Sequence, residues 1–176
     1  MSQECATHTF TWLPTAVLPR LRTARTAEAH RAPVRALIRN AHEDSVFGEI
    51  PFSDAKFGKS FDKTLVAPGQ HLGLVVTLNE RVLGCCYCSL GGYFIGEGAQ
   101  IVSVTTFNID RGCVASLLGG KVALRLAKSI ETWARANEAT HVLYHVTAGI
   151  EIARPDRFFR KIGMRQLGGN YGFEFG

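Results

Sequence analysis

The sequence predicts an α/β (α+β) fold in which about four helices flank a mixed, mostly antiparallel central sheet. Three features of the chain lead to this prediction. Short apolar runs separated by glycine-rich turns fill the middle of the chain and are typical of antiparallel hairpins. An amphipathic helix is expected over 118–135. It lies between apolar runs at 101–109 and 140–146, and the order strand, helix, strand forms a crossover unit.

The composition is that of an ordinary globular protein. The chain has 176 residues, 46% hydrophobic and 20% charged, which predicts a single domain. Residues 1–19 show no periodicity, so we expect an irregular N-terminal extension before a domain over 20–176. The formal net charge of +5 suits a ligand that bears phosphate or an acidic partner. The chain has no run of basic residues with interleaved aromatic residues, so we do not expect a dedicated nucleic-acid surface.

The lack of a recognisable targeting signal predicts a cytoplasmic protein, and the cysteine spacing predicts that it has no metal site. No apolar stretch approaches the roughly 18 residues of a membrane span. The N-terminus lacks the basic and apolar regions of a signal peptide. Cys85, Cys86 and Cys88 crowd one predicted strand, and no second cluster has the spacing of a zinc site. We therefore expect free, buried thiols and no bound metal.

The first half of the chain is expected to place two helices before a hairpin. Residues 21–25 alternate as in a short strand, and Thr26 can cap the helix that follows. The firmest part of that helix begins at Pro33, and a second helix is expected at about 53–65. A turn at 79–81 joins the two hairpin strands, which are predicted over 72–78 and 82–89.

The second half is expected to carry the crossover unit and a closing hairpin. A short helix over 157–162 ends at Gly163, since glycine is the usual residue just past a helix end. The last strands are predicted within 165–175.

The helix over 118–135 has two distinct faces. Its apolar stripe recurs at steps of three and four residues, and consists of Val122, Leu126, Ile130, Trp133 and Ala134. Its polar face recurs at the same steps, and consists of Lys121, Arg125, Lys128, Thr132 and Arg135. The pair Gly119-Gly120 is expected to open the helix. Free backbone N–H groups, the positive end of the helix dipole and Lys121 would then form an anion site.

Two familiar phosphate motifs do not fit this helix start. The Walker spacing requires a serine or threonine after its lysine, and Lys121 is followed by Val122. The dinucleotide-binding fingerprint fails because Gly119 and Gly120 are adjacent and no third glycine stands at the required step. The expected anion is therefore held in some other way.

The order of elements resembles the GNAT superfamily of acyl-CoA-dependent N-acetyltransferases over about residues 20–176. The acyl-CoA loop of that family, Gln/Arg-x-x-Gly-x-Gly/Ala, lies over residues 118–123. The family's late helix ends in an aromatic residue, three residues, a glycine and an apolar residue, which 159–164 matches. Leu118 departs from the basic or amide residue of the loop, and Lys121 from its first glycine. Phe159 stands where many members carry a tyrosine that protonates the departing thiolate.

The resemblance implies acetyl-CoA as co-substrate and a direct attack of a primary amine on the thioester. The pantetheine arm would pair with the fourth strand at 107–109. The residues that the resemblance assigns to the cofactor are Phe107, Asn108, Ile109, Leu118, Gly119, Gly120, Lys121, Val122, Ala123 and Phe159.

The acceptor side of the family's site implies the catalytic candidates Glu43 and Asp44, with Tyr171 as a replacement phenol. Tyr144 and His145 are further candidates. The acceptor stays open between a small amine, a protein amine and an aminoacyl-tRNA, and a homodimer is possible. The alternatives are a catalytically silent member of the fold that binds acyl-CoA or acts as an interaction protein, and a nucleic-acid-binding module.

Overall fold

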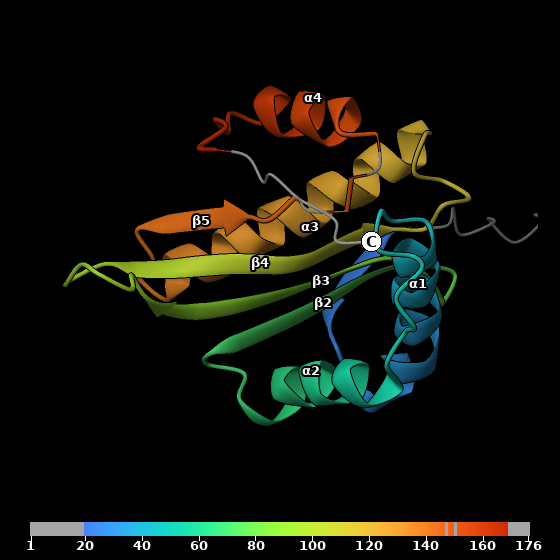
Figure 1. Ribbon diagram of the computed structural model, residues 1–176, viewed down its shortest axis with the longest axis horizontal. Coiled ribbons are helices and arrows are strands. Elements are labelled where there is room, and N and C mark those ends of the chain that lie inside the picture. The colour runs from blue at the N-terminus through green and yellow to red at the C-terminus, as the bar shows by residue number, and fades with distance from the viewer. Residues whose placement is uncertain (1–19, 147, 150, 169–176) are drawn as a thin grey trace, which may run out of the picture.

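The computed structural model describes residues 20–146, 148–149 and 151–168 (Figure 1). The predicted extension at 1–19 lies outside these residues. So does much of the predicted closing hairpin, including Tyr171. None of the helices in the described part of the chain is long and apolar enough to span a membrane.

A five-stranded sheet forms the centre of the domain, with the strands in the order β1-β2-β3-β4-β5. The first four strands pair antiparallel, and β5 pairs parallel with β4. The predicted mixed sheet is therefore confirmed. The strands are β1 (Arg22–Arg25), β2 (His71–Leu78), β3 (Arg81–Gly92), β4 (Gln100–Ile109) and β5 (His141–Tyr144).

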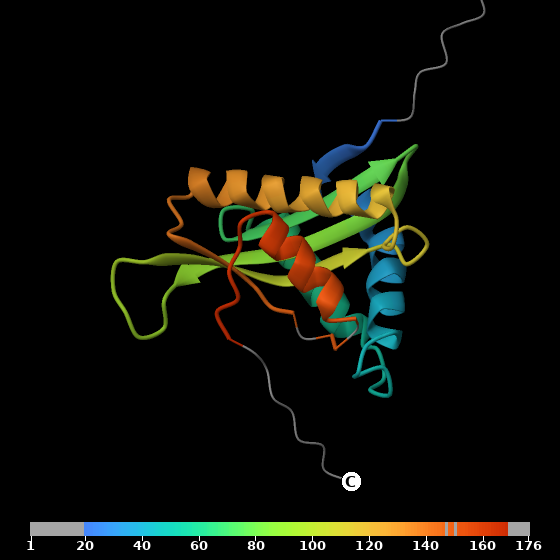
Figure 2. The ribbon, with the colours of Figure 1, turned by 90° about the horizontal axis from the view of Figure 1, so that it is seen from above.

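Helices cover both faces of this sheet (Figures 1 and 2). On one face lie α1 (Arg31–Glu43), which follows a 3-10 turn at Glu28–His30, and α2 (Asp54–Val66). On the other face lie α3 (Leu117–Ala136) and α4 (Ala153–Lys161). The four predicted helices are confirmed, with shifted starts. α1 begins two residues before Pro33, and α4 begins at Ala153 rather than near Arg157.

Each face of the sheet has its own core, and β3 supplies side chains to both. Cys86 and Cys88 pack in the core beneath α3, whereas Cys85 and Tyr87 pack beneath α1 and α2. This division follows from the alternation of side chains along a strand. The four described cysteines, which include Cys113, are free and buried. Burial raises the pKa of the Cys85 thiol to about 12, so this thiol stays protonated.

The apolar stripe predicted for α3 is the contact of this helix with the sheet. All five of its residues are buried, and Val122, Leu126 and Ile130 are fully so. On the exposed face, Arg135 forms an ion pair of 2.8 Å with Glu131 one turn earlier. The helical spacing in the sequence thus predicted the buried side of α3 correctly.

Candidate functional site

The sheet opens between β4 and β5. Their pairing ends where Val104 lies opposite Tyr144, and the last bond runs from the His145 N–H to the Val104 carbonyl at 3.2 Å. β4 continues beyond this point with β3 alone as its partner among the described strands. Its register against β3 shifts there, leaving Thr105 as an extra, bulged residue. A bulge bends a strand and increases its twist, which helps β4 to diverge from β5.

The open part of β4 presents unpaired backbone groups to the gap. The Asp110 N–H donates to the Leu83 carbonyl on β3 at 2.8 Å. Because hydrogen-bonding direction alternates along an antiparallel strand, Asn108 and Thr106 also direct their N–H and C=O groups to β3. Phe107 and Ile109 direct theirs to the other side. Two donors and two acceptors therefore face the gap, and an extended ligand could pair with them as a strand does.

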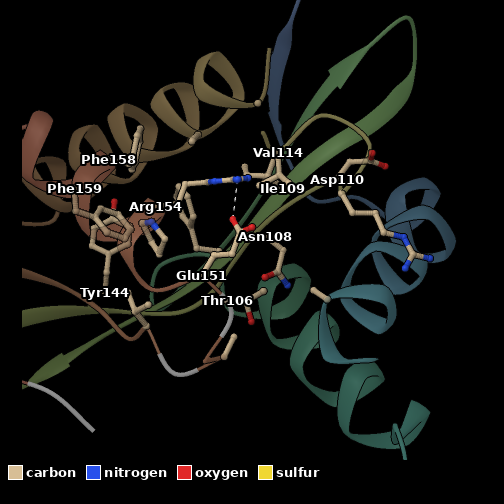
Figure 3. A pocket seen from close by; sticks show the side chains of 18 of the residues that line it. Thr106, Asn108, Ile109, Asp110, Val114, Tyr144, Glu151, Arg154, Phe158 and Phe159 are labelled. Carbon is tan, nitrogen blue, oxygen red and sulfur yellow. Dashed lines mark ion pairs between the residues drawn. The ribbon is translucent and has the colours of Figure 1, made fainter. Parts of the chain in front are cut away.

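A cleft of about 800 Å³ lies over this gap (Figure 3). Its walls come from the C-terminal part of α1, the open half of β4, the loop 110–116, the start of α3, the end of β5 and α4. Thr106 and Asn108 line its α1 side, because their side chains alternate with Phe107 and Ile109, which pack toward the α3 core. Segments that are distant in the sequence thus meet around the strand edge.

Aromatic side chains form the apolar wall of the cleft. The Tyr144 ring lies 4.7 Å from the Phe159 ring and 5.6 Å from the Phe107 ring, measured between centroids. Phe158 completes the cluster beside Phe159 at 5.3 Å. Burial, with a smaller contribution from nearby thiols, raises the pKa of Tyr144 above that of an ordinary phenol. Its hydroxyl is therefore protonated, and able to donate, throughout the neutral range.

The loop between β4 and α3 forms the polar end of the cleft. The Asp110 carbonyl accepts hydrogen bonds from the amides of Cys113 and Val114, at 2.9 Å each. Ser116 caps α3, since its hydroxyl accepts from the Gly119 amide at 3.2 Å. The amides of Ala115, Leu117 and Leu118 find no acceptor within the residues described. They lie at the positive end of the α3 dipole, where an anion is stabilised.

Four charged residues of the cleft form two ion pairs with one another. Arg111 lies 3.5 Å from Asp44, which joins the loop to the end of α1, and Arg154 lies 2.8 Å from Glu151. Figure 3 shows the Arg154–Glu151 pair inside the cleft. Glu151 has a φ of 38°, a left-handed conformation that is unfavourable for a residue with a side chain. Such strain is found more often at functional sites than elsewhere.

Most of the cofactor residues predicted from the sequence line this cleft. They are Phe107, Asn108, Ile109, Gly119, Gly120, Ala123 and Phe159, and of the catalytic candidates Asp44 joins them. Glu43, the last residue of α1, is exposed and does not line the cleft.

Three predicted cofactor side chains point elsewhere. Val122 is fully buried and Leu118 packs against the same core, because both belong to the apolar side of α3. Lys121 is exposed and does not line the cleft. It is the fifth residue of α3, beyond the first turn where the dipole acts. The helix begins at Leu117, so Gly119 and Gly120 lie within its first turn, slightly later than predicted.

The two glycines have different roles from the one predicted. A side chain at Gly119 would overlap the carbonyl oxygen of Cys113, so this glycine permits the loop to approach the helix closely. A side chain at Gly120 would meet nothing within 4 Å, and this position faces the cleft. Gly119 thus allows the loop to pack closely against the helix, and Gly120 leaves space in the cleft. The free amides come from the residues just before these glycines.

Several charged residues of the cleft were not predicted from the sequence: Arg111, Glu151, Arg154, Arg157 and Lys161. Two local features of the sequence bear on the start of α3 and on the cations of α4. Serine is a preferred N-cap, so Ser116 marks the true start of α3. Once α4 is known to begin at Ala153, its three cleft-lining cations fall at helical spacing on one face.

Known acetyltransferases share this architecture. A solved structure of the aminoglycoside N-acetyltransferase AAC(6')-Iy in complex with CoA has a TM-score of 0.70 at 10% identity, covering 92% of this chain and 99% of that one. The AAC(6')-IG enzyme from Acinetobacter haemolyticus has a TM-score of 0.64 at 14% identity, covering 88% and 98%. An acetyltransferase from Trypanosoma brucei has a TM-score of 0.62 at 15% identity, covering 89% and 100%.

These likenesses confirm that the chain has the GNAT fold, a mixed sheet with helices on both faces. No protein-family model and no curated protein matches the sequence. At such low identities the shared property is the fold.

Proposed function

We propose that the protein is an N-acetyltransferase that transfers an acetyl group from acetyl-CoA to a primary amine. The observation that carries the proposal is the open edge of β4, which leads along one cleft to the free amides at the start of α3. A pantetheine arm carries two amides in an extended chain and ends in a pyrophosphate. Its amides match the backbone groups of Phe107 and Ile109, and its phosphates match the α3 terminus.

The acetyl group would then lie where β4 and β5 separate, near Val104 and Tyr144. An amine that enters from the α1 side attacks the thioester carbonyl, the C–N bond forms and the C–S bond breaks. A backbone N–H on the open edge of β4 stabilises the negative charge that develops on the carbonyl oxygen. The attacking nitrogen loses a proton, and the CoA sulfur leaves as a thiolate or gains a proton.

The acceptor amine must be neutral to attack, so a carboxylate near it assists by taking a proton directly or through water. Asp44 is the better placed of the two carboxylates predicted from the sequence, because it lines the cleft and Glu43 does not. Glu151 also lines the cleft, beside Arg154. Tyr171 lies outside the described residues and stays a prediction.

We assign the proton donor for the thiolate to Tyr144. Phe159 has no hydroxyl, and the Tyr144 phenol lies against it in the aromatic wall of the same cleft. Figure 3 shows Tyr144, Phe158 and Phe159 grouped at one end of the cleft. A phenol carried by β5 can thus occupy the space beside residue 159 that a phenol on α4 would otherwise fill.

Thermal unfolding in the presence of acetyl-CoA tests whether this molecule is the acetyl donor. At about 100 times the dissociation constant, binding adds about 2.7 kcal/mol to the free energy of unfolding. For a domain of this size that raises the melting temperature by roughly 5–10 °C. An unchanged melting temperature at millimolar acetyl-CoA would remove the proposal.

An acceptor screen then separates an enzyme from a silent member of the fold. Small amines, peptides and aminoacyl-tRNAs are offered with acetyl-CoA, and free CoA thiol is measured. We expect thiol release with at least one class. If acetyl-CoA binds tightly but no class of amine releases CoA thiol, the protein is instead a catalytically silent member of the fold. This alternative has a specific basis, because Phe159 lacks the hydroxyl that could protonate the departing thiolate.

A further inference from the structure

One face of α4 carries three cations into the cleft. Arg154, Arg157 and Lys161 recur at steps of three and four residues, and all three line the cleft. Arg154 and Arg157 also line a smaller hollow of about 390 Å³ at the start of α4. By contrast, Arg160 on the same helix does not line the cleft and forms an ion pair of 2.8 Å with Asp156.

Two of these cations form no ion pair with another residue in the described part of the chain. Arg154 is paired with Glu151, whereas Arg157 and Lys161 take part in none of the ion pairs between described residues. They stand four residues apart on one helix, and like charges at this spacing destabilise a helix. An anion bound between them would reverse this effect, because each would then have a charged hydrogen-bond partner.

The α4 cations and the α3 amides belong to different elements, so the cleft offers two separate anion-binding groups. Acetyl-CoA carries two separate anionic groups, the pyrophosphate and the 3′-phosphate on its ribose. Building on the proposed function, we propose that Arg157 and Lys161 bind the 3′-phosphate of CoA. This face of α4 would therefore select a CoA thioester over a donor that carries only phosphopantetheine.

Isothermal titration with CoA and with 3′-dephospho-CoA tests this assignment. We expect the wild-type protein to bind CoA about tenfold more tightly than 3′-dephospho-CoA, because one charge-assisted hydrogen bond at an exposed site contributes about this much. The variants Arg157→Gln and Lys161→Gln should each reduce this ratio, and the double variant should bring it close to one. Affinity for 3′-dephospho-CoA should change by less than about twofold. Arg160→Gln is the matched control and should keep the wild-type ratio.

The outcomes distinguish this proposal from the function on which it rests. If the wild-type protein binds both ligands equally well, α4 does not bind the 3′-phosphate, although the donor assignment stands. If the double variant loses the same affinity for both ligands, the cations hold the pyrophosphate instead and the proposal is overturned. If neither ligand binds the wild-type protein, the donor itself is wrong. Arg157 and Lys161 are exposed, so circular dichroism should show all variants folded.

Discussion

The two halves of β4 differ although they belong to one continuous strand. Residues 101–104 pair with β3 on one side and β5 on the other, and Val102 and Val104 are buried there. Residues 106–109 pair with β3 alone among the described strands, and together with the bulged Thr105 they line the cleft. The first half is therefore part of the core, whereas the outer edge of the second half has no partner among the described strands. The change occurs at the bulge of Thr105.

The largest expected effect is a difference in the free energy of unfolding between variants in the two halves of β4. Val102→Asp places a carboxylate where no side-chain surface is exposed, and an unpaired buried charge of this kind costs more than about 4 kcal/mol. We expect the variant to be unfolded or nearly so. Asn108→Asp places the same group on the cleft, and we expect its free energy of unfolding to change by less than about 1 kcal/mol. Urea denaturation measures both, and equal losses would show that the halves do not differ.

The next effect concerns the backbone of the open half. Phe107→Pro removes an N–H that points to the gap, so we expect acetyl-CoA affinity to fall at least about tenfold below that of Phe107→Ala. The alanine variant controls for the lost ring. Asn108→Pro removes an N–H directed to β3, and we expect it to lower the melting temperature instead. If the proline and alanine variants at 107 bind acetyl-CoA alike, the ligand does not pair with this edge.

Where β5 leaves β4, the Tyr144 phenol should affect turnover more than binding. We expect Tyr144→Phe to lower kcat by about 10- to 100-fold, since a thiolate leaves tolerably well without an acid. The dissociation constant for acetyl-CoA should stay within about twofold. Phe159→Tyr restores a phenol 4.7 Å away between ring centroids, so the double variant should regain much of the lost rate. A loss that Phe159→Tyr leaves unchanged would indicate that Tyr144 only supports the packing of the cleft.

The smallest effect tests whether α3 is divided in the same way as β4. We expect Gly119→Ala to destabilise the protein by about 1–3 kcal/mol, because the new methyl group would overlap the Cys113 carbonyl. Gly120→Ala faces open space in the cleft and should stabilise the helix by about 0.5–1 kcal/mol. Thermal unfolding of the two single variants decides this, and effects of the same sign would contradict the division.

The sequence by itself determined the two-faced elements of this protein. The stripe on α3 and the alternation of Cys85, Cys86 and Tyr87 on β3 were readable because they depend on helical and strand periods, which are local. The hairpin turn was readable for the same reason. Asn79 and Glu80 both adopt positive φ there, 48° and 66°, as a tight hairpin turn between two strands requires.

The tertiary structure alone decided the shape of the site. The opening of β4 from β5 depends on pairing between strands that lie on either side of the whole helix α3, and the sequence carries no local mark of it. The sequence did direct attention to the correct helix end. Only the packing of Gly119 against Cys113 and the cap at Ser116 decided which amides stay free. Local patterns specify which face of an element is buried, whereas the points at which elements part depend on contacts between distant residues.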